Sequence, residues 1–178
     1  FEGDYLLRVA MPIGGIGTGT ISLGGRGNLQ DFELVNRPAK GFSPRNAFFA
    51  LWAKAPGKPA VTRALEGQIH PFHYEGPFGC MLPNHTLPRF RKAKFHAAYP
   101  LAQVELADPD VPLRVRIEAF NPMIPADADA SGIPVAILRF VLINPTGKAV
   151  DASVCGSLAN FIGSDTTGSH DKATQKNR

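Results

Sequence analysis

The sequence contains few cysteines, the residues whose disulfide bonds stabilise small secreted domains. It has two cysteines, Cys80 and Cys155, among 178 residues, which is too few for a disulfide framework. Each cysteine lies among small and apolar neighbours, so we expect two buried free thiols. A reducing compartment such as the cytoplasm fits this usage.

Long apolar runs are also absent. No segment approaches the roughly 18 apolar residues that a membrane-spanning helix needs. The opening FEGDYLLRVA lacks both the basic start and apolar centre of a signal peptide and an initiator methionine, so we expect the chain to begin inside a longer polypeptide. A hydrophobic fraction of 44% excludes a disordered chain. We therefore expect a soluble globular protein without a transmembrane segment.

Helical periodicity is scarce as well. No segment longer than a turn places apolar residues at the spacing of a helix face. Short runs of strand character lie between 16 prolines and 18 glycines, at residues 20–25, 29–35, 47–54, 90–98, 101–107, 111–120, 133–144 and 149–162. Strands at this spacing predict an all-β fold, an antiparallel β-sandwich. We assign residues 1–163 to the sandwich and 164–178 to a polar loop or frayed tail.

Two of these strands have distinctive patterns. Segment 111–120 alternates Leu113, Val115, Ile117 and Ala119 with charged residues, which predicts a half-buried strand. Segment 133–144 is apolar on both faces except at Arg139. We therefore expect it to be a central strand.

The net charge of +4 raises the question of a nucleic-acid partner. The best basic cluster with aromatic residues is RFRKAKFH, residues 89–96. As one strand, it would place Phe90, Lys92, Lys94 and His96 on one face. A solvated strand face explains this pattern, so we expect no nucleic-acid partner.

Seven glycines lie between Met11 and Gly27, a density that invites comparison with phosphate-binding loops. In a dinucleotide fingerprint the third glycine would fall on Thr20 or Ser22. In a P-loop beginning at Gly14, Thr20 stands where the lysine is required. The glycines therefore indicate close approach of another chain segment rather than a bound nucleotide.

Metal and catalytic patterns are incomplete. The motif DADASG, residues 127–132, begins like a calcium loop, but Leu138 stands where the closing glutamate would be. His70 and His73 have no third ligand at a suitable spacing. No nucleophile with a base and no evident carboxylate pair is present. We expect no cofactor, no metal and no catalytic residue.

The order of several motifs resembles the N-terminal domain of glycoside hydrolase family 116, which includes non-lysosomal glucosylceramidases and bile-acid β-glucosidases. The motifs are MPIGGIGTGTISLGGRGNLQDFELVNRPAKG, TLPRF and VRIEAFNPMIPADADASGIPVAILRFVLINPTG. The resemblance runs from about Arg8 to Gly163 in collinear order. It implies a β-sandwich joined to a larger C-terminal (α/α)6 barrel.

The resemblance also implies a function for the whole enzyme. Family members are retaining β-glycosidases whose glutamate nucleophile and aspartate acid/base lie in the barrel, so no residue here inherits a catalytic role. The expected partners are that barrel and a β-glucoside such as a glucosylceramide-like substrate. The alternative is a stand-alone carbohydrate-binding or adhesive sandwich, with Trp52, Tyr74 and Tyr99 as stacking groups.

The chain is shorter than the family's sandwich, so we expect an incomplete sandwich that self-associates, with residues 11–27 and 163–178 mobile. The candidate residues for a domain interface or cleft rim are Gly14, Gly15, Gly17, Gly19, Arg26, Arg37 and Asn121. The glycines could equally pack within the sandwich. Likewise, the three polar residues could instead form hydrogen bonds with turns inside it.

Overall fold

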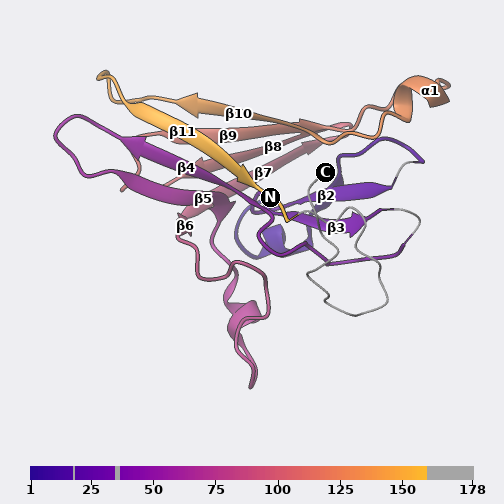
Figure 1. The fold of residues 1–178 in the computed structure, drawn as a ribbon, viewed down its shortest axis with the longest axis horizontal. Helices are drawn as coiled ribbons and strands as arrows, with labels where there is room; N and C mark the ends of the chain where they lie inside the picture. Colours follow the sequence, from indigo (N-terminus) through magenta and orange to yellow (C-terminus); the bar gives the residue numbers. More distant parts are fainter. Residues whose placement is uncertain (18, 35–36, 160–178) are drawn as a thin grey trace.

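The computed structural model describes residues 1–17, 19–34 and 37–159 as a set of three β-sheets with short helical turns (Figure 1). The strands are β1 (Ala10–Pro12), β2 (Thr20–Gly24), β3 (Leu29–Glu33), β4 (Phe48–Lys54), β5 (Val61–Gly67), β6 (Arg89–Phe90), β7 (Lys92–Ala98), β8 (Leu101–Ala107), β9 (Arg114–Phe120), β10 (Ile137–Ile143) and β11 (Asp151–Ser157). The helical turns are η1 (Gly3–Arg8), η2 (Pro71–Tyr74) and α1 (Ala128–Ser131).

The described strands form two four-stranded sheets and one three-stranded sheet. Their orders are β10-β9-β8-β7, β11-β4-β5-β6 and β1-β2-β3. Neighbouring strands run antiparallel, except that β6 runs parallel to β5. The predicted all-β, largely antiparallel fold is confirmed. The segment between β5 and β6 projects away from the sheets (Figure 1).

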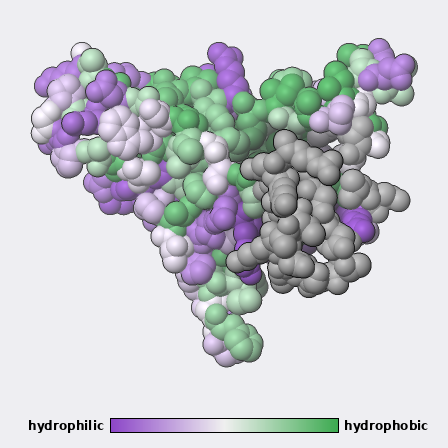
Figure 2. All heavy atoms as spheres, in the orientation of Figure 1, coloured by the Kyte–Doolittle hydropathy of each residue, from purple (hydrophilic) through white to green (hydrophobic). Residues whose placement is uncertain are grey.

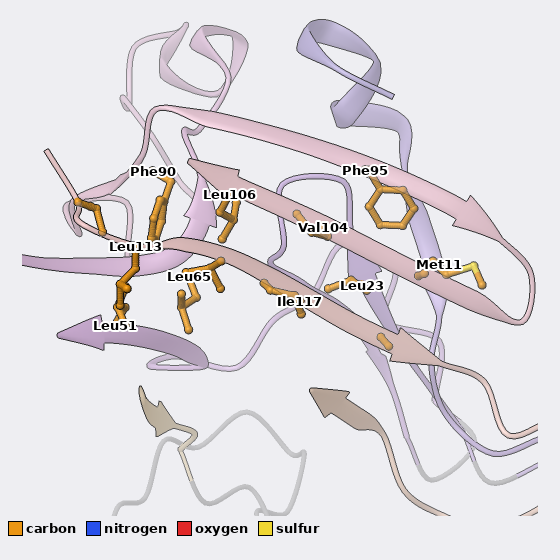
Figure 3. Close-up of a cluster of buried hydrophobic side chains, with 14 of the residues drawn as sticks. Met11, Leu23, Leu51, Leu65, Phe90, Phe95, Val104, Leu106, Leu113 and Ile117 are labelled. Atoms are coloured by element: carbon orange, nitrogen blue, oxygen red, sulfur yellow. The ribbon is translucent and has the colours of Figure 1, made fainter. Parts of the chain in front are cut away.

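One apolar core joins the three sheets (Figure 3). Leu51 and Leu65 come from the β11-β4-β5-β6 sheet, Val104 and Ile117 from the opposing sheet, and Leu23 from β2. These side chains point toward one another between the sheets. The alternation predicted for segment 111–120 is confirmed, because its apolar positions are buried and the intervening charged residues are more exposed.

Two strands escape sequence reasoning, namely β1 and β5. Strand β5 lacks alternation, because its last four residues are all buried. Leu65 belongs to the apolar core, and the adjacent Glu66 is buried against Arg26 and Arg89. Burial on both faces removes the period of two on which strand prediction depends.

The basic segment does not form one strand. Phe90 ends β6 in one sheet, and Lys92 begins β7 in the other. The expected common face for Phe90 and the basic residues is therefore wrong, because the chain changes sheets at Arg91. Phe90 is fully buried, whereas Lys92, Lys94 and His96 are exposed, as expected for a solvated strand face.

Strand β10 is not central. It lies at the edge of its sheet and pairs with β9 alone among the described strands. Ile137 and Ile143 are each 40% exposed. The prediction from segment 133–144 is wrong because apolar residues on both faces do not determine how many strands pair with it.

The cysteines are not buried as expected. Cys80 is half-buried and Cys155 is exposed. Cys155 lies on β11, an edge strand whose residues are almost all exposed. Small apolar neighbours therefore did not indicate burial at this position.

No helix in the described residues is long and apolar enough to cross a membrane. The predicted polar tail, residues 164–178, lies outside the described residues.

Apolar side chains remain exposed along β10 and β11 (Figure 2). They include Ile137, Leu142, Ile143 and Val154. Exposed apolar strand edges favour pairing with another chain. We expect the purified chain to self-associate at micromolar concentration, measured by size-exclusion chromatography with light scattering. Ile143→Lys should reduce association, and Thr62→Lys on β5 should not. A wild-type monomer would contradict this expectation.

Candidate functional site

The glycine-rich segment lies against another part of the chain. A Cβ atom at Gly15 would clash with the carbonyl oxygen of Ile133 and lie 2.8 Å from its carbonyl carbon. The amide of Ile16 donates to the carbonyl of Ser131 at 2.8 Å. Segment 131–133 therefore packs directly on the backbone of residues 15–16.

Other glycines of this segment also admit close neighbours. A Cβ atom at Gly19 would lie 2.8 Å from the carbonyl oxygen of Glu33, and one at Gly27 would lie 3.0 Å from that of Leu65. At Gly25 it would meet the backbone of Leu6 in η1. These glycines therefore permit another segment of the same chain to approach their backbone closely.

Gly14 and Gly17 differ from their neighbours. A Cβ atom at Gly14 would make only an ordinary contact, 3.4 Å from the carbonyl oxygen of Gly19. Gly17 has open space around it and a φ of +79°, a conformation that glycine adopts readily. The contacts described here lie within the sandwich, and an interface role for these glycines stays a prediction.

Arg26 belongs to a buried ionic cluster. It forms an ion pair with Oε2 of Glu66, and Nε of Arg89 binds the same oxygen at 3.0 Å. Glu66 lies at the end of β5, and Arg89 begins β6. Burial lowers the pKa of Arg26, while the charge of Glu66 opposes that shift. The cluster joins the β2–β3 turn to the β5–β6 pair.

A cleft of about 990 Å³ opens beside Arg26. Asp4, His70 and His73 also line it, and Nε2 of His70 lies 3.1 Å from Oδ1 of Asp4. Arg26 therefore connects the buried cluster to a surface hollow.

His73 should titrate below the usual range of histidine. Burial lowers its pKa, and the positive charges of Arg26 and His70 lower it further. The imidazole is therefore neutral at pH 7, and below about pH 6.5 the unfolded chain takes up the proton first. Its contribution to stability thus falls as the pH falls. NMR titration should show a midpoint that rises in Arg26→Gln and stays in place in Arg114→Gln. An unchanged midpoint in Arg26→Gln would contradict the assignment of the charge effect to Arg26.

Asn121 connects the end of β9 to two other segments. Its amide donates to the carbonyl of Pro100 at 2.9 Å, and its Nδ2 lies 3.5 Å from the carbonyl oxygen of Pro12. The side chain is buried. These contacts are of the kind expected if Asn121 braces turns inside the sandwich.

Arg37 lies apart from these groups. It is exposed in the loop after β3, and its amide donates to the carbonyl of Leu34 at 3.2 Å. Nearby, Oε1 of Glu33 accepts from the amide of Ala39 at 3.0 Å. The structure therefore places Arg26, Arg37 and Asn121 in three separate environments.

Sequence reasoning missed Glu66 and Arg89 as members of the ionic cluster. Arg89 belongs to the motif TLPRF, which carried part of the family resemblance, and begins the basic cluster of residues 89–96, but neither pattern indicated a buried ion pair. Glu66 had none, because a single glutamate among apolar residues is common.

The remaining motifs have structural explanations. Oδ1 of Asp127 accepts from the amide of Ala130 at 2.9 Å and caps α1, so the DADASG motif forms a helical turn between β9 and β10. No group of three or more potential metal ligands occurs in the part of the chain that the structure describes.

Comparison with protein-family models decides the family. The model described as beta-glucosidase 2, glycosyl-hydrolase family 116 N-term, matches residues 10–178. The chain belongs to this family. A search of curated proteins finds no match. The family 116 match covers every strand of the sandwich and every candidate residue named above.

The family 116 assignment gives these features a context. An N-terminal domain of this family belongs to a larger enzyme with further domains. The sandwich, the glycine contacts and the ionic cluster are therefore parts of one domain of that enzyme.

Proposed function

We propose that this chain is a non-catalytic domain of a retaining β-glucosidase and packs against a C-terminal (α/α)6 catalytic barrel. The family match over residues 10–178 carries the proposal. The substrate class is β-glucosides, including glucosylceramide-like lipids.

The ion-pair and hydrogen-bond partners of the buried carboxylates support a non-catalytic role for this chain. Glu66 binds two arginines. Asp108 accepts from the amides of Arg91 and Asp110, and Asp31 accepts from that of Gly41. Retaining hydrolysis requires two carboxyl groups about 5 Å apart that face a bound sugar. These three carboxylates instead stabilise turns and strand ends.

Activity measurements test the proposal directly. The complete polypeptide should hydrolyse an aryl β-glucoside, and the chain of residues 1–178 should not. Turnover by the short chain that scales with its concentration through purification would overturn the non-catalytic assignment.

Arg37 offers a test of domain packing. In the complete enzyme, Arg37→Ala should lower kcat/KM by about tenfold, about 1.4 kcal/mol, because the exposed guanidinium binds the adjoining domain near the rim of the active-site cleft, which is not the cleft beside Arg26. The melting temperature should change little, since Arg37 is exposed in the sandwich. Arg45→Ala, at a neighbouring exposed arginine, is the matched control. Parallel losses of activity and melting temperature in Arg37→Ala would instead favour a role within the sandwich.

The stand-alone carbohydrate-binding module has weaker support. Trp52, Tyr74 and Tyr99 are exposed, as stacking groups would be. They lie on β4, on η2 and in the β7–β8 turn, and none of them lines the cleft beside Arg26. A reading frame that continues into a helical barrel would exclude this alternative.

A further inference from the structure

The ionic cluster beneath the cleft carries an unbalanced charge. Two guanidinium groups, Arg26 and Arg89, share one carboxylate oxygen of Glu66. The side chains of Glu66 and Arg89 are 8% and 5% exposed. One positive charge is therefore left over in a largely buried setting, where an unpaired charge is costly.

Arg89 uses its donors inside the protein. Its Nη1 donates to the carbonyls of His85 and Leu87 at 3.1 and 2.9 Å. Its Nη2 donates to the carbonyl of Asn84 at 2.8 Å, and its Nε donates to Glu66. Arg89 is thus fixed in place as a structural member of the cluster.

Arg26 is different, because it binds Glu66 through Nη1 alone. Among the residues that the structure describes, none accepts a hydrogen bond from its Nε or Nη2. Its side chain is 17% exposed and lines the cleft. The surplus charge and the unused donors therefore coincide on one guanidinium at the cleft wall.

The described lining of the cleft is also basic. Its acidic members are Glu2, Asp4 and Glu105. Six arginines and lysines line it, namely Arg26, Arg91, Lys92, Lys94, Arg114 and Arg116. Lys94 pairs with Glu2, Arg91 with Asp110 and Arg116 with Glu118. The excess positive charge of the described lining therefore comes from the Arg26 cluster, Lys92 and Arg114. A cleft whose lining carries a net excess of one sign of charge concentrates ions of the opposite sign.

We propose that this cleft binds a small oxyanion from solution, a phosphate or carboxylate compound, with Nε and Nη2 of Arg26 as its principal donors. The planar guanidinium matches such groups and can donate two parallel hydrogen bonds. His70 and His73 lie in the same cleft. The inference goes beyond the proposed function and does not depend on it.

Titration calorimetry with inorganic phosphate tests the proposal on the complete polypeptide. Wild type should bind phosphate at one site. Arg26→Gln should weaken binding by at least about tenfold, because it removes charge-assisted hydrogen bonds. Arg114→Gln, which removes another arginine of the same cleft, should weaken binding by less than about twofold.

A second variant keeps the test decisive if Arg26→Gln fails to fold, as judged by circular dichroism. Arg26→Lys retains the charge beside Glu66 but lacks the planar guanidinium that donates two parallel hydrogen bonds, so phosphate affinity should fall several-fold. Equal losses of phosphate affinity in Arg26→Gln and Arg114→Gln would overturn the proposal. Binding would then depend on the summed positive charge of the cleft and not on the donors of Arg26. Absence of phosphate binding to wild type would also overturn it, including the case in which a carboxylate of the polypeptide itself fills the cleft.

Discussion

Glu66→Gln should lower the free energy of unfolding by about 3–5 kcal/mol, the largest effect that we expect from a single substitution in this chain. The substitution removes the anion that Arg26 and Arg89 share. Both guanidiniums then remain largely buried without a charged partner. Urea denaturation followed by circular dichroism measures the loss.

Two further variants make this prediction specific. Glu105→Gln removes an exposed carboxylate on β8, and it should cost less than about 1 kcal/mol. The double variant Glu66→Gln with Arg26→Gln should recover part of the loss, because only one unpaired guanidinium remains. Losses in the double variant that equal the sum of the two single losses would show that the charges do not interact.

Gly15→Ala should destabilise the domain by about 3 kcal/mol, whereas Gly14→Ala should be neutral or slightly stabilising. At Gly15 a Cβ atom would meet backbone atoms of Ile133, and backbone yields less readily than a side chain, so overpacking costs about 1–3 kcal/mol or more. At Gly14 the nearest atom would lie at an ordinary contact distance. Alanine there restricts the unfolded chain, which stabilises by about 0.4–1 kcal/mol.

Thermal unfolding of the two variants side by side provides the measurement. The two positions are adjacent in the sequence and receive the same substitution but have different neighbours in space, so each serves as the other's control. Similar melting temperatures for Gly14→Ala and Gly15→Ala would mean that segment 131–133 does not pack on the glycines as described.

The fold could be predicted from the sequence where the information is local. The alternation of Val115, Ile117 and Ala119 depends only on the period of a strand, and it placed these residues in the core. The order of strands in a sheet depends on distant partners. For that reason segment 133–144 was expected at the centre and lies at an edge.

One part of the candidate site could be predicted from the sequence, and another part could not. The density of glycine indicated close approach of another segment, and the structure identifies segment 131–133 as that neighbour of Gly15. The arginine cluster was out of reach, because Glu66 lies 40 residues after Arg26 and 23 before Arg89. Arg26 could be chosen as a polar residue in a matched motif, but its partners follow only from the tertiary structure.

The contact between Gly15 and Ile133 has a consequence for synthesis on the ribosome. Residues 15–16 of the glycine-rich segment precede β2 to β9 in the sequence, whereas their neighbour in the native structure, segment 131–133, is translated only after β9. Until Ile133 leaves the exit tunnel, the backbone of residues 15–16 lacks the hydrogen bond from Ile16 to Ser131. Closing so long a loop is slow and leaves early segments exposed. The nascent chain is therefore expected to expose its glycine-rich segment until segment 131–133 has been synthesised, which gives a chaperone a defined interval in which to bind it.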